Sequence, residues 1–250
     1  MQANLMGLVD HTMLKPYYGV QEVRRLVDEA SRFGCYSVCV NPVYVSYVRH
    51  LVDDMGLSLR VCSVVDFPFG ASDTESRELA IGRAARAGAD EVDIVAPITL
   101  VKSGRWPWVE RDLRRVVAAA HGLGLKIKVI VEDAYTTLDE KRRLYELVAI
   151  SDADFIKTST GFEDREYASS IGNPAGAQVS NVRLMREVAS KYKPSIGIKV
   201  AGGIRSVKQI MDLLEASGRP PSPDSFRVGT SATALIWDEL NRARGQLTSL

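Results

Sequence analysis

The chain has 250 residues, and its 32 lysine and arginine residues against 31 aspartate and glutamate residues give a formal net charge of +1. Because both signs are spread along the chain, the charge predicts no basic surface for nucleic acid or for an anionic membrane. No window reaches the roughly 18 apolar residues of a spanning helix, and the N-terminus lacks a signal-peptide pattern. We therefore expect a soluble, cytoplasmic protein that binds neither nucleic acid nor membrane.

Short β-branched runs alternate with amphipathic segments throughout the chain, with no linker or change of composition between them. In chain order, strands are expected at LVDHTM (8–13), YSVCV (36–40), LRVCSVV (59–65), EVDIV (91–95), KIKVIV (126–131), DFIKTS (154–159), IGIKVA (196–201) and FRVG (226–229). The segments between them repeat apolar residues at helical spacing, which would cover the sheet. Eight such units in one domain, residues 1–250, predict a single (β/α)8 TIM barrel, with a doubly wound open sheet as the alternative.

Start and stop signals support these helices. Capping boxes are predicted for Ser72 with Glu75, Thr137 with Glu140 and Ser206 with Gln209. Helix ends are predicted at four glycines: Gly34, Gly56, Gly88 and Gly122.

Polar residues inside the expected strands are informative, because barrel strands are otherwise buried on both faces. Alternation places Asp93 opposite Val92 and Ile94. By the same rule Lys157 and Lys199 point into the barrel, near the carboxyl ends of their strands, where barrel enzymes build active sites. Lys128, near the start of its strand, is expected at the opposite face and away from the site.

Two lysines that face each other are costly as buried cations, so at least one should be neutral. A neutral amine attacks an aldehyde or ketone to form a Schiff base, and a neighbouring ammonium keeps such a nucleophile deprotonated. The Asp93 carboxylate would hold the remaining cation and transfer protons. The alternative is that Lys157 and Lys199 form structural salt bridges with no catalytic part.

Glycine-rich turns follow the last two strands, at AGGIR (201–205) and VGTS (228–231). In eight-stranded barrels these loops commonly bind phosphate through backbone N–H groups. Gly202, Gly203, Gly229 and Ser231 fit that role, with Arg205 as a nearby charge.

The sequence offers little for other chemistries. The three histidines, His11, His50 and His121, are scattered and predict no metal site, and the three cysteines predict reduced core or pocket thiols. No nucleophile elbow, P-loop or dinucleotide fingerprint is present. The segment 163–175 is expected to be a lid over the site rather than a domain boundary.

With Lys157, Lys199 and Asp93 in these positions, the chain resembles the deoxyribose-phosphate aldolase family, which are class I aldolases with a (β/α)8 barrel. The resemblance covers most of the chain. It rests on seven motifs: DHTMLKP (10–16), VCVNP (38–42), FPFGA (67–71), GADEVDIV (88–95), DFIKTSTGF (154–162), IKVAGGIR (198–205) and RVGTS (227–231).

The resemblance implies a role for each matching residue. Lys157 would be the Schiff-base lysine, Lys199 the neighbour that favours its neutral amine, and Asp93 the proton-relay acid. Substrate contacts are expected from Asp10, Thr12, Cys39 and Thr158. Phosphate contacts are expected from Gly161, Gly202, Gly203, Arg205, Gly229 and Ser231.

The implied reaction is reversible cleavage of 2-deoxy-D-ribose 5-phosphate to acetaldehyde and D-glyceraldehyde 3-phosphate. It needs no cofactor and no metal, and its only expected partners are the small phosphosugar and further copies of the chain. Four aromatic residues could lie at such a homo-oligomer interface or pack within the helix layer: Tyr44, Tyr47, Trp106 and Trp108.

Two segments depart from the family pattern. After the fifth strand the chain reads VEDAYTTLDEK, which is expected to place Asp133 and Tyr135 at the mouth of the barrel, and the loop 163–175 is longer than usual. Other readings stay open: another class I aldolase or a transaldolase acting on a different phosphorylated sugar, a phosphosugar isomerase of the same fold, and a phosphate-binding barrel without catalysis.

Overall fold

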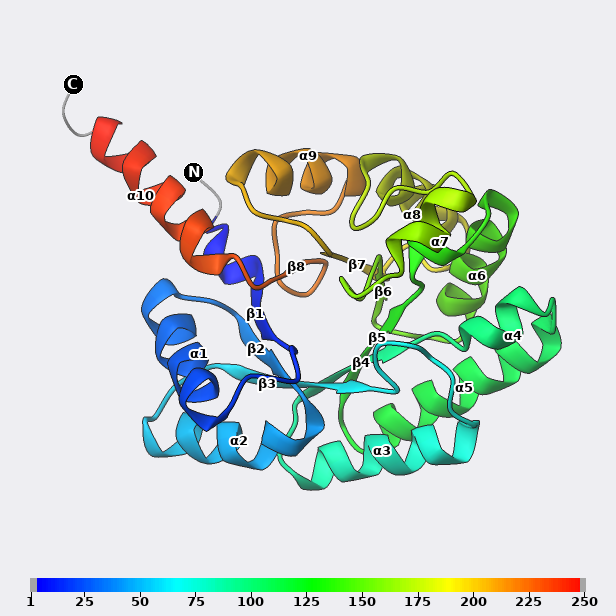
Figure 1. The fold of residues 1–250 in the computed structure, drawn as a ribbon, viewed down its shortest axis with the longest axis horizontal. Helices are drawn as coiled ribbons and strands as arrows, with labels where there is room; N and C mark the ends of the chain where they lie inside the picture. The colour runs from blue at the N-terminus through cyan, green and yellow to red at the C-terminus, as the bar shows by residue number, and fades with distance from the viewer. Residues whose placement is uncertain (1–3, 248–250) are drawn as a thin grey trace.

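The computed structural model describes residues 4–247 of the chain, and of residues 244–247 only the backbone. All strands are parallel and lie in chain order around a closed barrel (Figure 1). They are β1 Val9–Met13, β2 Ser37–Val40, β3 Arg60–Val65, β4 Glu91–Val95, β5 Lys126–Ile130, β6 Phe155–Lys157, β7 Gly197–Ala201 and β8 Phe226–Thr230. Because β8 pairs with β1, the predicted (β/α)8 barrel is confirmed and the open sheet is excluded.

Helices surround the barrel on its outside (Figure 1). They are α1 Val20–Phe33, α2 Val45–Asp54, α3 Thr74–Arg86, α4 Ile98–Lys102, α5 Trp106–Gly122, α6 Leu138–Ile150, α7 Arg165–Ser170, α8 Val179–Tyr192, α9 Val207–Ser217 and α10 Thr233–Leu247. Residues 4–247 also contain three 3-10 turns: η1 Met6–Leu8, η2 Pro42–Tyr44 and η3 Asp133–Tyr135. No helix in the described part of the chain is both long and apolar enough to cross a membrane.

The aliphatic residues of the strands face outward and form the core with the helices. Val92, Ile94, Ile156 and Ile198 are fully buried between the barrel and this helix layer. Each such side chain stabilises the fold by roughly 1.5–3 kcal/mol relative to exposure. The alternate positions of the same strands point into the barrel, so the residues available for chemistry are the polar ones.

Most of the predicted helix boundaries are confirmed. Thr137 and Glu140 form a capping box at α6. At α9 only half of the predicted box is present: the Ser206 hydroxyl caps the helix, whereas the Gln209 side chain accepts from the Arg205 N–H. The prediction for Ser72 was wrong, because its hydroxyl donates to Asp66 at 2.8 Å and Asp73 caps α3 instead. The prediction for Gly122 is confirmed, because α5 ends at this residue, and Gly124 takes the left-handed backbone (φ 75°) two residues later.

The four aromatic residues considered for an interface differ in burial. Tyr44, Tyr47 and Trp106 are half-buried and pack against the core, as ordinary helix-layer residues do. Trp108 is exposed, with 63% of its surface accessible.

Candidate active site

The interior of the barrel brings Asp93, Lys157 and Lys199 together. In the β6–β7 register Lys157 lies beside Lys199, and both ammonium nitrogens are 2.7 Å from Oδ2 of Asp93. All three side chains are buried, and Lys157, with 3% of its surface accessible, is the one that reaches a cavity. The strand alternation seen in the sequence thus places two amines on one carboxylate oxygen.

Lys128 also belongs to this cluster, and the prediction that it lies away from the site was wrong. Its ammonium nitrogen is 2.8 Å from Oδ1 of Asp93 and 2.7 Å from Oε2 of Glu91. Asp93 and Lys128 are register partners on β4 and β5. Since a strand rises only about 3.3 Å per residue, the lysine side chain readily spans the layer between the start of the strand and the site.

A second layer of charges supports the first. Asp10 places Oδ2 at 2.6 Å from the Lys199 ammonium, and its Oδ1 accepts from the Arg227 guanidinium. Arg227 also donates to Glu91 Oε1 at 2.8 Å and lies 3.6 Å from the centre of the Tyr36 ring. These contacts continue the ion-pair network from the site to the bottom of the barrel.

The network contains more basic groups than acidic ones. Three carboxylates, those of Asp10, Glu91 and Asp93, face four basic side chains. The basic side chains are those of Lys128, Lys157, Lys199 and Arg227. A surplus charge in a buried network is costly, so the balance favours one neutral amine.

The carboxylates and two of the lysines in this network are held in their charged forms. Burial raises the pKa of Asp93, but the nearby lysines Lys128, Lys157 and Lys199 outweigh it and hold that pKa well below its usual range. Burial lowers the pKa of Lys199, but Asp10 and Asp93 outweigh it, and the pKa lies above its usual range. The pKa of Lys128 is raised by Asp93 and other acidic neighbours in the same way, against burial.

A cavity of about 310 Å³ opens at the carboxyl end of the barrel above Lys157. The six residues expected to bind phosphate all line it, as does Thr12: Gly161, Gly202, Gly203, Arg205, Gly229 and Ser231. Gly202 has φ 94°, a backbone conformation that a residue with a side chain rarely adopts. A Cβ at Gly229 would lie 3.2 Å from Cε of Lys199, so this glycine leaves space for the lysine.

The other three residues expected to contact substrate lie below the cavity surface. Asp10 is fully buried against Lys199 and Arg227. The Thr158 hydroxyl donates to the Ala201 carbonyl and accepts from its N–H, which joins β6 to β7. Cys39 is buried beside its register partner Cys62.

Sequence reasoning missed several cavity residues. Lys15, Tyr18, Phe162 and Arg165 line it as well. Lys15 stands inside a motif already singled out, and its ammonium lies 4.1 Å from the centre of the Phe162 ring. Arg165 is part of the long loop, and a loop with no periodicity gives no signal for where its side chains point.

The segment after β5 differs from its expected place. Asp133 is buried and accepts a hydrogen bond from the Tyr145 hydroxyl of α6, so the prediction that it lies at the mouth was wrong. Burial raises the pKa of Asp133 to about 7. Tyr135 does reach the loop 163–175, since its hydroxyl accepts from the Asp164 N–H at 2.8 Å.

One group of described side chains has the spacing of a metal site: Cys39, Cys62 and Asp93. Each oxygen of Asp93 already accepts from two donors, among them the Cys62 thiol at 3.2 Å and the Lys128 ammonium. We therefore assign the cluster to the lysine network.

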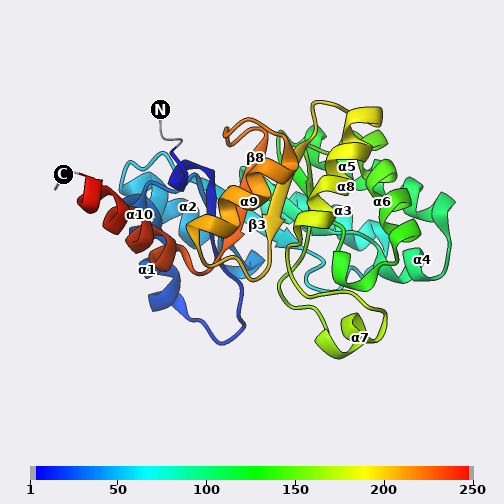
Figure 2. The same cartoon turned by 90° about the horizontal axis from the view of Figure 1, so that it is seen from above.

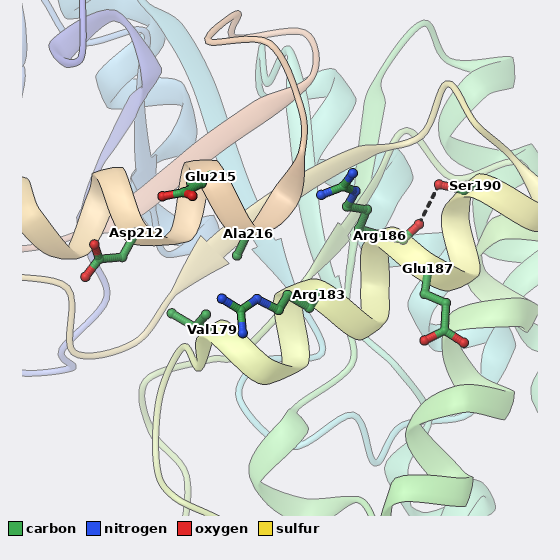
Figure 3. A pocket seen from close by; sticks show the side chains of 8 residues that line it. All are labelled: Val179, Arg183, Arg186, Glu187, Ser190, Asp212, Glu215 and Ala216. Carbon is green, nitrogen blue, oxygen red and sulfur yellow. Dashed lines mark hydrogen bonds between the residues drawn. The ribbon is translucent and has the colours of Figure 1, made fainter.

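A second hollow, of about 600 Å³, lies on the outer surface between α8 and α9 (Figure 3). Arg183, Glu187 and Asp212, which line it, belong to the helix layer. None of its lining residues belongs to a strand or to a loop at the carboxyl end of the barrel, so it is separate from the lysine site.

Comparison with known proteins agrees with this geometry. The profile of the DeoC/LacD family aldolases matches residues 5–219. A deoxyribose-phosphate aldolase from Thermoplasma volcanium is 46% identical over 97% of this chain and 96% of its own length. One from Pyrobaculum neutrophilum is 42% identical over 93% of this chain and 98% of its own.

The chain belongs to the DeoC/LacD family of aldolases. Among solved structures, the tetrameric deoxyribose phosphate aldolase from Aeropyrum pernix superposes with a TM-score of 0.78 at 28% identity. The alignment covers 96% of this chain and 92% of that chain. The two chains therefore share the barrel fold along almost their whole length.

Proposed function

We infer that the protein is a deoxyribose-phosphate aldolase, which reversibly cleaves 2-deoxy-D-ribose 5-phosphate to acetaldehyde and D-glyceraldehyde 3-phosphate. The observation that carries this inference is the pair of amines on one buried carboxylate, with Lys157 alone of the interior lysines at a cavity. The named activity of relatives that match over more than nine tenths of the chain supports it.

We propose that Lys157 is the nucleophile. Its neutral amine adds to C1 of the open-chain sugar, and loss of water gives an iminium ion. A base removes the proton of the C3 hydroxyl, the C2–C3 bond breaks, and its electrons move to the iminium nitrogen. Glyceraldehyde 3-phosphate leaves, the remaining enamine takes a proton at C2, and water releases acetaldehyde. Because the imine accepts the electron pair, the reaction requires no cofactor.

Asp93 and Lys199 serve as the proton relay in this proposal. Asp93 Oδ2 lies within hydrogen-bond distance of both amines, so a proton can pass between Lys157 and Lys199 through one carboxylate. Asp10 holds Lys199 from below, and the Lys199 cation disfavours a second ammonium beside it.

We propose that the phosphate binds at the glycine turns of the same cavity. The turns at Gly161, Gly202 and Gly203 and the residues Gly229 and Ser231 at the end of β8 line the cavity. Their backbone N–H groups are suitable donors, and Arg205 supplies a charge. We place the protein in the cytoplasm as a homo-oligomer, in line with the tetrameric relative from Aeropyrum pernix.

A coupled assay for glyceraldehyde 3-phosphate tests the function. The wild-type protein should release it from deoxyribose 5-phosphate, and Lys157→Leu should lose at least three orders of magnitude in kcat, because the covalent route is gone. Release of product from ketose phosphates but not from deoxyribose 5-phosphate would instead indicate a different class I aldolase or a transaldolase.

A further inference from the structure

Three basic side chains converge on the rim of the cavity from three different loops. Lys15 follows β1, Arg165 opens α7, and Arg205 follows β7. Among side chains 4–243, which the structure describes, none of the three has a carboxylate within 4.0 Å. The interior lysines differ, since each has a carboxylate partner. The rim therefore carries unpaired positive charge.

Arg165 belongs to the loop 163–175, which projects at the site end of the molecule (Figure 2). The loop is fastened at its start by the hydrogen bond from Asp164 N–H to the Tyr135 hydroxyl. Tyr167 of α7 packs edge-on against the Tyr135 ring, with ring centres 5.7 Å apart. These contacts fix the position of α7 relative to η3.

The C-terminal end of the loop makes more hydrogen bonds to the rest of the barrel than its start does. Asn173 donates to three backbone carbonyls of the segment 133–136 and accepts from the Lys141 ammonium at 3.1 Å. Ala177 N–H donates to the Gly202 carbonyl at 3.1 Å, and a Cβ at Gly176 would lie 2.6 Å from that oxygen. The loop thus packs directly on the β7 turn that lines the cavity.

We propose that Arg165 is a specificity-determining residue, held by the lid so that its guanidinium binds the substrate's phosphate. The glycine turns offer neutral N–H donors, whereas a phosphate carries close to two negative charges and binds a guanidinium by paired hydrogen bonds. Among the described residues that line the cavity, Glu163 is the one acidic side chain, and it lies at the start of the same loop. Its charge opposes a phosphate, so the excess of basic groups has to come from Lys15, Arg165 and Arg205.

This inference rests on the proposed function and predicts how substrates are ranked. Arg165→Ala should raise KM for deoxyribose 5-phosphate by about 10- to 100-fold, the size of a lost charged hydrogen-bond pair. KM and kcat for unphosphorylated deoxyribose should stay within twofold. The KM of Arg165→Lys for deoxyribose 5-phosphate should lie between the values of the wild type and of Arg165→Ala. Inhibition by inorganic phosphate should weaken in Arg165→Ala.

Two further variants make the test specific. Arg111→Ala removes an exposed arginine of α5 and should leave both substrates unaffected. Asn173→Ala removes the loop anchor and should raise KM for the phosphorylated substrate in the same direction as Arg165→Ala. Equal effects of Arg165→Ala on both substrates, or none on either, would overturn the inference. Cleavage of neither substrate by the wild type would instead overturn the proposed function.

Discussion

At the scale of single residues, Lys128 is the most instructive side chain. Its strand position suggested a stabilising residue remote from the site, yet it shares Asp93 with Lys157 and Lys199. Strand alternation predicts which face a residue takes, but not how far a long side chain reaches along the barrel axis. Asp93, Lys157 and Lys199 could therefore be found from the sequence, and the contacts of Lys128 and Arg227 could not.

Lys128→Met should have two effects. Two buried carboxylates, Glu91 and Asp93, lose a partner, which typically costs 3–5 kcal/mol of stability. Asp93 also loses the cation at its Oδ1, so the proton relay around this carboxylate changes and the pH profile of kcat/KM should shift. Denaturant unfolding and the pH dependence of kcat/KM measure the two effects.

Lys126→Met is the matched control for this prediction. Lys126 lies two residues earlier on β5 and pairs with Asp224 at the surface, where ion pairs contribute little. Its pH profile should overlay that of the wild type. A Lys128→Met profile that also overlays the wild type would show that Lys128 does not act on the proton relay.

At the scale of elements, the segment from β5 through η3 to α7 shows where sequence patterns fail. Helix α6 could be predicted because Thr137 and Glu140 form its capping box. Helices α4 and α7 could not, since five and six residues are too few to show a helical repeat. The site residues contributed by such short elements, Arg165 among them, become visible only in the fold.

Asp133 makes the stability of the folded chain depend on pH. Its pKa of about 7, well above the ordinary value of 3.8, means that the folded state keeps a proton that the unfolded chain releases. The contribution of Asp133 to the free energy of unfolding is therefore fully present below pH 4 and is lost as the pH rises to 7. Asp133→Asn removes the ionisation and should be more stable relative to wild type at pH 8 than at pH 5, by up to about 3 kcal/mol, because the pKa of about 7 lies about 2 units above pH 5.

Urea unfolding at the two pH values measures this difference. Asn can still accept the hydrogen bond from the Tyr145 hydroxyl, so the packing against α6 is kept. Asp139→Asn, at an exposed position on α6, should show no such difference between pH 5 and pH 8. A stability difference for Asp133→Asn that does not change with pH would contradict the prediction.

At the scale of the whole molecule, the sequence predicted the barrel because its strands combine two patterns. Outward residues such as Val92 and Ile198 are aliphatic, and inward residues such as Asp93 and Lys199 are polar, so both the core and the site could be located. Barrel closure brings Asp10 of β1 to Arg227 of β8. No short-range pattern predicts a contact between residues so far apart in the chain.

In the proposed mechanism the barrel presents one reactive amine among three interior lysines. Lys128 and Lys199 are fully buried and each is held by two carboxylates. Lys157 has one carboxylate contact, shared with Lys199, and the cavity above it. This arrangement predicts that the Schiff base forms on Lys157 alone.

Reduction with sodium borohydride in the presence of deoxyribose 5-phosphate, followed by peptide mapping, tests this claim most directly. We expect one reduced adduct, on Lys157, which is absent from Lys157→Leu. An adduct on Lys128 or Lys199 in the wild-type protein, or undiminished cleavage by Lys157→Leu, would contradict it.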